Sequence, residues 1–170
     1  MKIRYATLKD IPAILVLGEA MMEESRFRDY GLNREKCAKM LETMISTPSR
    51  SVILIAEHTH GNIVGMLAGY VVDFFFCDAV VAQDRFFFVK PEARGSSAAI
   101  KMLMIFRRWA EQRNVSELNI NMSVAVKMSR FNKMMSKLGF RCCGSNFSLG
   151  LGHGGESLNL SPVSTTKEAR

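Results

Sequence analysis

Residues 89–99 combine the residue types that hold a phosphate group, and they read Val-Lys-Pro-Glu-Ala-Arg-Gly-Ser-Ser-Ala-Ala. They join an apolar strand, predicted over residues 82–89, to a helix predicted over residues 97–113. The first N–H groups of a helix have no partner within it, and together with the helix dipole they attract anions. Small side chains let a phosphate reach these groups, and Arg94 adds a positive charge. A plain tight turn before a buried helix has the same composition, so the loop alone does not identify its ligand.

Hydrophobic periodicity predicts the elements that position this loop. The 170 residues, 48% of them hydrophobic, suit one domain over residues 1–152, followed by a polar, flexible tail over residues 153–170. One helix is expected to start at Thr7 or Asp10, and Asn33 is expected to cap a second. The other predicted elements are strands over residues 2–6, 51–57, 63–76, 82–89, 117–121, 140–143 and 145–151, and helices over 97–113 and 126–137. This order predicts an α+β fold, in which helices flank a mixed sheet.

Several glycines and phenylalanines make the packing more specific. Gly65 and Gly69 within one long apolar strand indicate a bend, a bulge or a close approach to its backbone. The runs Phe74–Phe76 and Phe86–Phe88 predict buried strand segments. Gly139 is expected to follow the last helix as its C′ residue.

The charge and the cysteines narrow the class of protein. A net charge of +7 favours anionic partners, either a small polyphosphate ligand or nucleic acid. The positive residues are scattered, which is typical of a solvated surface and puts a nucleic-acid-binding module last. We expect no metal site, because no CxxC pair and no histidine at metal spacing accompany the four cysteines, Cys37, Cys77, Cys142 and Cys143.

The same features bear on the compartment. A polar N-terminus is not typical of a signal peptide, and no apolar run has the length of a membrane span. Cysteines without a disulfide pattern favour reduced thiols. We therefore expect a cytoplasmic protein that does not bind a membrane.

The loop resembles motif A of the GNAT N-acetyltransferase superfamily, Q/R-x-x-G-x-G/A after an apolar strand. Arg94 matches its first position and Ala99 its last, whereas Ser97 replaces the central glycine. The sequence Arg-Gly-Ser-x-Ala-Ala in this loop resembles members from phage and their bacterial hosts. Further matches follow in order over residues 2–151: Ile3-Arg4-x-Ala6, Met22-Glu23-Glu24-Ser25, Ile63-Val64-Gly65 and Lys137-Leu138-Gly139-Phe140.

This resemblance implies a GNAT-like, mostly antiparallel sheet and acetyl-coenzyme A as the cofactor. The pyrophosphate would lie on N–H groups of the loop, and the pantetheine arm would pair with the backbone at a strand bulge. The thioester would enter the gap between that strand and residues 118–121. The residues implied to bind the cofactor are Phe88 and Val89 at the bulge, and Arg94, Gly95, Ser96, Ser97, Ala98 and Ala99 in the loop.

Acetyl transfer to an amine requires a base, because only the neutral amine attacks. Asp84 at the start of the motif strand is the first candidate, with Glu24 and Asp73 behind it, although each can also be a solvated surface carboxylate. A backbone N–H at the bulge, that of Val89, is expected to stabilise the thioester oxygen.

The residues that the family uses in its fourth helix are absent from this sequence. Its usual acid, a tyrosine, is replaced by Met135, and its usual asparagine by Met128. Methionine cannot donate a proton, so acid catalysis does not follow the family's pattern.

The resulting hypothesis is an N-acetyltransferase that moves an acetyl group from acetyl-coenzyme A to a primary amine of a small molecule or a protein. The alternative is a catalytically silent GNAT-fold protein that binds coenzyme A or has a structural or interaction role. The sequence leaves the acceptor open. It also leaves a homodimer open, through an edge strand near the C-terminus.

Overall fold

The computed structural model describes residues 1–58, 61–121 and 127–144. They belong to two compact units. One contains Met1–Met21 and the described part of Leu32–Met122, and the other contains Met22–Gly31 and the described part of Ser123–Arg170. The predicted strand over residues 145–151 and the predicted tail over residues 153–170 lie outside the described residues, and the domain limits stay a prediction.

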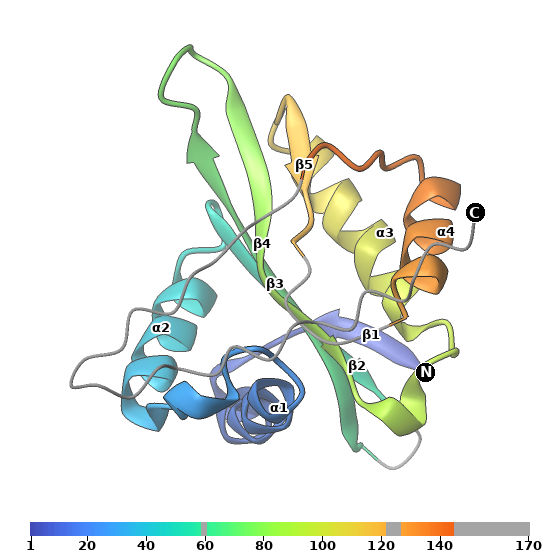
Figure 1. Ribbon diagram of the computed structural model, residues 1–170. Helices are drawn as coiled ribbons and strands as arrows, with labels where there is room; N and C mark the ends of the chain where they lie inside the picture. Colours follow the sequence, from blue (N-terminus) through green and yellow to red (C-terminus); the bar gives the residue numbers. More distant parts are fainter. Residues whose placement is uncertain (59–60, 122–126, 145–170) are drawn as a thin grey trace, which may run out of the picture. The chain divides into compact units, whose positions relative to one another are not determined.

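A five-stranded sheet forms the centre of the first unit (Figure 1). Its strands follow the sequence in the order β1 (Lys2–Tyr5), β2 (Ser51–Glu57), β3 (Ile63–Asp73), β4 (Val80–Val89) and β5 (Glu117–Asn119). The first four strands are antiparallel to their neighbours, and β5 pairs with β4 in parallel. The parallel pair requires a crossover, which a helix between β4 and β5 supplies.

Helices cover both faces of this sheet. The helix α3 (Ala98–Glu111) packs against β1 to β4 on one face, whereas α1 (Ile11–Glu23) and α2 (Arg34–Ser46) lie on the other (Figure 1). The buried residues of α3 recur at helical spacing, which is the reason that one stripe of this helix covers the sheet. They are Ala98, Met102, Leu103, Phe106, Trp109 and Ala110. The predicted fold class, a mixed and mostly antiparallel sheet flanked by helices, is confirmed.

Two glycines of β3 allow α3 to approach the sheet closely. A Cβ atom at Gly69 would lie 2.2 Å from the ring of Phe106, and one at Gly65 would lie 3.2 Å from the side chain of Met102. The register between β3 and β4 also shifts next to Gly69, between Ala68 and Gly69. The predicted close approach is therefore present at Gly69, and a register shift between β3 and β4 lies beside it.

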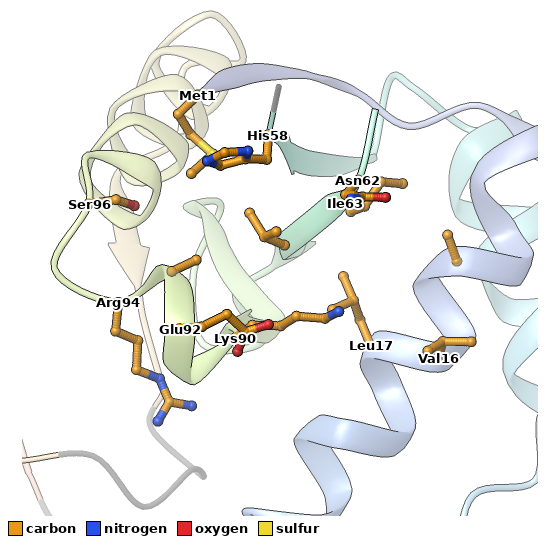
Figure 2. A pocket seen from close by; sticks show the side chains of 13 residues that line it. Met1, Val16, Leu17, His58, Asn62, Ile63, Lys90, Glu92, Arg94 and Ser96 are labelled. Carbon is orange, nitrogen blue, oxygen red and sulfur yellow. The ribbon is translucent and has the colours of Figure 1, made fainter. Parts of the chain in front are cut away.

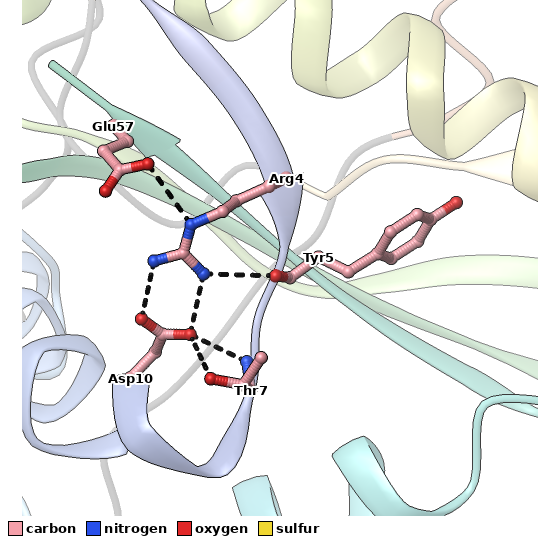
Figure 3. Close-up of polar contacts among 5 residues, drawn as sticks. All are labelled: Arg4, Tyr5, Thr7, Asp10 and Glu57. Carbon is pink, nitrogen blue, oxygen red and sulfur yellow. Dashed lines mark hydrogen bonds and ion pairs between the residues drawn. The ribbon is translucent and has the colours of Figure 1, made fainter. Parts of the chain in front are cut away.

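An ion pair connects β1 to the start of the first helix (Figure 3). Two nitrogens of Arg4 each donate to one oxygen of Asp10 at 2.8 Å, and Nε of Arg4 donates to Glu57 at 3.2 Å. Asp10 also accepts the backbone N–H of Thr7, at 2.7 Å, and its hydroxyl. Thr7 thus caps a 3₁₀ turn over Leu8–Asp10 that continues into α1. The Arg4 guanidinium holds the pKa of the Asp10 carboxyl well below its usual range.

The second predicted cap also agrees with the structure. The side chain of Asn33 accepts the backbone N–H of Lys36 at 2.9 Å and so satisfies one of the free donors at the start of α2. In the second unit, α4 (Met128–Lys137) ends at Leu138, and Gly139 follows it with φ +88°. This is the left-handed conformation that a C′ glycine adopts.

Two predicted strand segments differ in the structure. Residues 140–143 form no strand, and no described strand pairs with them. Phe74–Phe76, predicted as buried strand, lie beyond the end of β3 in a hairpin that the N–H of Phe74 closes by donating to the carbonyl of Ala79 at 2.8 Å. Phe75 is 81% exposed and Phe76 is 79% exposed. No described element extends far enough to cover these rings, so their apolar character did not bury them.

Candidate functional site

The strands β4 and β5 separate partway along β4. They pair only from Val81 to Gln83 on β4, opposite Glu117 to Asn119 on β5. Directly after this pairing, the register with β3 skips Arg85, because Gly69 opposes Asp84 and Ala68 opposes Phe86. Arg85 is therefore the extra residue of a β-bulge, which bends a strand and leaves one residue unpaired.

Among the described residues, nothing pairs with the outer edge of β4 from the bulge to the end of the strand. The N–H of Lys90 donates to the carbonyl of Val64 at 2.9 Å, and Val89 stands opposite Gly65. Hydrogen-bonded and non-hydrogen-bonded pairs alternate in an antiparallel ladder, so Phe87 and Val89 direct their N–H and C=O groups away from β3. No described residue pairs with β4 on that side beyond Gln83. This edge can therefore pair with an extended, amide-bearing ligand.

The predicted location of the bulge was wrong. Phe88 and Val89 lie in regular register with β3, and the bulge falls at Arg85. Phe88 is opposite Met66 in a hydrogen-bonded pair, so its backbone groups are used within the sheet. The position of a bulge depends on the register of two strands, which one strand's sequence does not specify.

Asp84 lies where β4 and β5 separate, and its side chain, instead of the β4 backbone, bonds to the residues that follow β5. Its Oδ1 accepts the backbone N–H of Asn121 at 2.7 Å and the side-chain amide of Asn121 at 3.1 Å. The residue is only 6% exposed, and burial raises the pKa of its carboxyl to about 6, although the bonds from Asn121 act in the opposite direction. The backbone N–H of Asp84 itself also donates to this carboxylate and favours its ionised form. Asp84 is thus a carboxylate that can exchange a proton near neutral pH.

The loop after β4 presents unbonded N–H groups at the start of α3. A 3₁₀ turn over Pro91–Ala93 places Arg94 to Ser97 directly before the helix. The N–H groups of four residues make no hydrogen bond to any described residue: Gly95, Ser97, Ala99 and Ile100. Within the predicted loop, the N–H groups of Arg94, Ser96 and Ala98 instead bond locally, to Pro91, Ala93 and the Ser96 hydroxyl.

Only one residue of the loop needs to be glycine. Gly95 has φ +86°, in the left-handed region, and nothing lies within 4 Å of the Cβ atom it lacks. Ser97, which replaces the central glycine of the resembled motif, has φ −75° and ψ 0°. Any residue adopts these angles, so serine at this position does not strain the loop.

The side chain of Arg94 is hydrogen-bonded to the end of β4. Its Nε donates to the carbonyl of Val89 at 2.9 Å, and its guanidinium lies over the Phe88 ring at 5.6 Å. Arg94 is one of the residues that line a cleft of about 750 Å³ between the loop and α1 (Figure 2). Lys90 extends across this cleft toward Leu17. Neither Asp84 nor Asn121 lines the cleft.

The candidate base Asp73 does not lie beside Asp84. Asp73 at the end of β3 is exposed and forms an ion pair with Arg50 at 3.2 Å. Glu24, Met128 and Met135 belong to the second unit. The first unit therefore contributes one buried carboxylate to the site.

Sequence reasoning missed three parts of this site. Asn121 bonds to Asp84 across 37 residues of sequence, which no local pattern reports. The apolar side chain of Phe87 predicts a strand but does not show that its backbone faces the open edge. Arg85 shows no signal that distinguishes a bulge.

Within the described residues, no group of three His, Cys, Asp or Glu side chains is placed to hold a metal ion. Of the helices in those residues, none is long and apolar enough to cross a membrane.

Comparisons with known proteins give the same architecture. An acetyltransferase of Trypanosoma brucei is 18% identical, with a TM-score of 0.68 over 88% of this chain and 99% of its own. An aminoglycoside antibiotic 6'-N-acetyltransferase of Acinetobacter baumannii is 17% identical, with a TM-score of 0.68 over 90% and 99% of the two chains. A ribosomal-protein-alanine N-acetyltransferase of Brucella melitensis is 17% identical, with a TM-score of 0.64 over 89% and 100%.

At these low identities, the TM-scores show a shared fold alone. No curated protein matches the sequence. Residues 19–140, which are most of the chain, match the model of the GNAT acetyltransferase family. The open edge of β4 and the loop of unbonded N–H groups lie within this match. The chain therefore belongs to the GNAT acetyltransferase family.

Proposed function

We propose that the protein is an N-acetyltransferase that uses acetyl-coenzyme A to acetylate a primary amine. The observation that carries this proposal is the open edge of β4, which runs from a buried carboxylate to a loop of unbonded N–H groups. Asp84 and Val89 stand opposite Gly69 and Gly65, which are four residues apart on β3, so the edge between them is about 14 Å long. An extended phosphopantetheine arm is the kind of ligand that fits between two such ends.

The chain's own groups fit two parts of this cofactor, the pyrophosphate and the pantetheine arm. The unbonded N–H groups of Gly95, Ser97 and Ala99 bind the pyrophosphate, because they lie at the positive end of α3. The backbone groups of Phe87 and Val89 pair with the amides of the pantetheine arm. When bound, acetyl-coenzyme A supplies the activated acetyl group.

The bulge places a hydrogen-bond donor close to the reacting end. Val89 was the expected donor to the thioester oxygen, but it lies at the loop end of the edge, far from Asp84. We assign this role to the N–H of Arg85, the residue that the bulge leaves without a partner in β3.

Asp84 acts as the base in this proposal. Its Oδ1 is held by Asn121, and Oδ2 remains to accept a proton from the acceptor amine, directly or through a water. A carboxyl with a pKa of about 6 is mostly ionised at pH 7 and still binds a proton more readily than an ordinary aspartate. Glu24 remains a second proposed base.

The test measures cofactor binding and turnover separately. Calorimetry with coenzyme A should show binding, and thiol release from acetyl-coenzyme A should follow with at least one amine of a panel. The panel contains polyamines, amino acids, an aminoglycoside and a peptide with an N-terminal alanine, since two structural neighbours are named for the last two kinds of acceptor. Absence of coenzyme A binding contradicts the proposal.

The alternative function, a silent coenzyme A-binding protein, rests on Met135. A methionine stands where the family's tyrosine would protonate the leaving thiolate, and thiolates leave tolerably well without a proton. Tight binding of coenzyme A without turnover on any acceptor would favour the alternative.

We place the activity in the cytoplasm. All four cysteines are free thiols, and three of them are exposed. Exposed thiols persist in a reducing compartment.

A further inference from the structure

The β3–β4 hairpin ends in an exposed aromatic tip, which we define as residues 74–79. The rings of Phe75 and Phe76 lie 3.9 Å apart between centroids, and Phe74 lies 5.6 Å from Phe75. Three phenyl rings thus form one apolar surface that nothing described covers. An exposed apolar cluster of this kind marks an interaction surface.

A separate groove of about 310 Å³ lies in the same unit, and we call it the end groove. Most of its walls are apolar, from α2, β1, β2 and α3. The residues that form them include Tyr5, Met44, Pro48, Val52 and Trp109, with Arg113 at the rim. No acidic side chain lines it.

The tip and the end groove lie at the same end of the sheet. Pro48 and Ser51 line the groove, and Arg50 between them pairs with Asp73, the last residue of β3 before the tip. The N–H of Val71 also donates to the carbonyl of Arg50 at 2.9 Å. Any second molecule that covers one of the two surfaces is therefore near the other.

The two surfaces are complementary in charge as well as in polarity. The tip contains Asp78, for which no described residue supplies a cation. Arg113 at the groove lies 4.1 Å over the Trp109 ring and donates only to carbonyl oxygens, those of Pro48, Ser49 and Trp109. An aromatic tip with one carboxylate matches an apolar groove with one unneutralised guanidinium.

We propose that the tip of one copy enters the end groove of a second copy, and that the tip of the second copy enters the end groove of the first. Because tip and groove share one end of the sheet, the two contacts can be related by a twofold axis. A reciprocal contact of this kind closes on itself and yields a dimer, not a filament. The inference is independent of acetyl transfer.

An anionic lipid surface fits the tip less well. Asp73 and Asp78 flank the three phenylalanines, and their charges would face the lipid head groups. A lipid surface would also leave the end groove uncovered.

Sedimentation equilibrium of the full chain tests the proposal, over about 1 to 100 µM because dimerisation depends on concentration. We expect a dimer for the unchanged chain and a dissociation constant at least about tenfold higher for Phe75→Ser with Phe76→Ser, since buried aromatics dominate interfaces. Met104→Ser is the matched control, because Met104 is an exposed apolar residue of α3 outside both surfaces. A monomer at every concentration, or a double variant that dimerises normally, overturns the proposal.

A disulfide cross-link locates the contact. Cys77 is an exposed cysteine in the tip, and Gln112 lines the end groove. One chain keeps only Cys77, and the other carries Gln112→Cys with its natural cysteines replaced by serine. Oxidised glutathione should join the two chains in a mixture, because tip and groove belong to different copies. Faster joining of Cys77 to Cys77 would show that tips meet each other, and vesicle binding by a monomeric chain would show a lipid surface; either result overturns the proposal.

Discussion

Burial and hydrogen bonding have opposite effects on the free energy of ionising Asp84. Its burial favours the neutral carboxyl, whereas Asn121 donates two hydrogen bonds that favour the ionised form. The pKa of Asp84 stays above its ordinary value because burial has the larger effect. Its folded pKa exceeds its unfolded pKa, so ionisation of Asp84 costs stability as the pH rises from about 4 to about 6.

Replacement of Asp84 separates its catalytic role from its structural role. Asp84→Asn should lower kcat/KM by about 10²- to 10⁴-fold, because it removes the base. In the unchanged enzyme kcat/KM should rise through about pH 6 as Asp84 loses its proton, and this rise should be absent in the variant. Steady-state rates between pH 5 and pH 8 give both results.

Thermal unfolding of the same variant shows whether the fold has survived. At pH 8 Asp84→Asn should be no less stable than the unchanged chain, because it removes a buried charge and keeps an acceptor for Asn121. Asp73→Asn is the control and should keep both rate and pH profile. An Asp84→Asn variant that turns over normally contradicts the role of Asp84 as base.

The cofactor loop yields a second prediction at this scale. Gly95→Val should weaken coenzyme A binding by about tenfold or more, because a β-branched residue resists φ +86° and would rearrange the unbonded N–H groups. Calorimetry with coenzyme A measures this change.

Ser97→Gly serves as the matched comparison. It restores the glycine of the resembled motif, yet Ser97 already has ordinary backbone angles, so affinity should not improve. A large gain in affinity would mean that the loop is strained at Ser97, contrary to its angles.

At the scale of elements, the features that sequence predicted well are local ones. Asn33 caps α2 through a contact three residues away, and Gly139 ends α4 through its own φ angle. Phe74–Phe76 were misplaced because three apolar residues after a strand indicate burial only if another element covers them. The bulge and the Asp84–Asn121 bonds escaped prediction because they depend on register and on contacts far apart in sequence.

The Arg4–Asp10 pair makes an element-scale prediction about acid stability. Asp10→Asn should cost about 2 kcal/mol of unfolding free energy at pH 7, because it leaves a half-buried guanidinium with a weaker partner. The folded pKa of Asp10 lies below its unfolded value, so the pair's contribution is complete above about pH 4 and is lost as the pH falls further. Denaturant unfolding at several pH values should therefore show the two chains converging in acid.

An exposed ion pair is the control for this experiment. Arg107 and Glu111 form an i, i+4 pair on the surface of α3, and Glu111→Gln should change stability little. An equal loss from both substitutions would contradict a special role for Asp10.

The whole molecule carries a net charge of +7, without a block of positive residues. A diffuse positive field attracts a polyphosphate ligand over a distance but does not select nucleic acid. We expect the dissociation constant of coenzyme A to rise several-fold between about 50 and 500 mM KCl, because salt screens this attraction.

Pantetheine binding distinguishes the long-range effect of the chain's positive charge from the local contacts with the ligand. It lacks the phosphates, so its weaker binding should be independent of salt. The same salt dependence for both ligands would show that the charge of the chain does not act on the phosphates.

The bulge at Arg85 has a consequence for the coding sequence. Arg85 is the one residue of β4 that β3 skips, so an in-frame loss of its codon would leave every other β3–β4 partner and every side-chain direction unchanged. Loss of a codon for Phe87 would instead move side chains of one part of the strand to the opposite face of the sheet. Without Arg85, the strand would be straight enough for β5 to continue beside it, and the opening for the cofactor would close. A single deleted triplet at Arg85 could thus produce a well-folded paralogue that no longer binds coenzyme A.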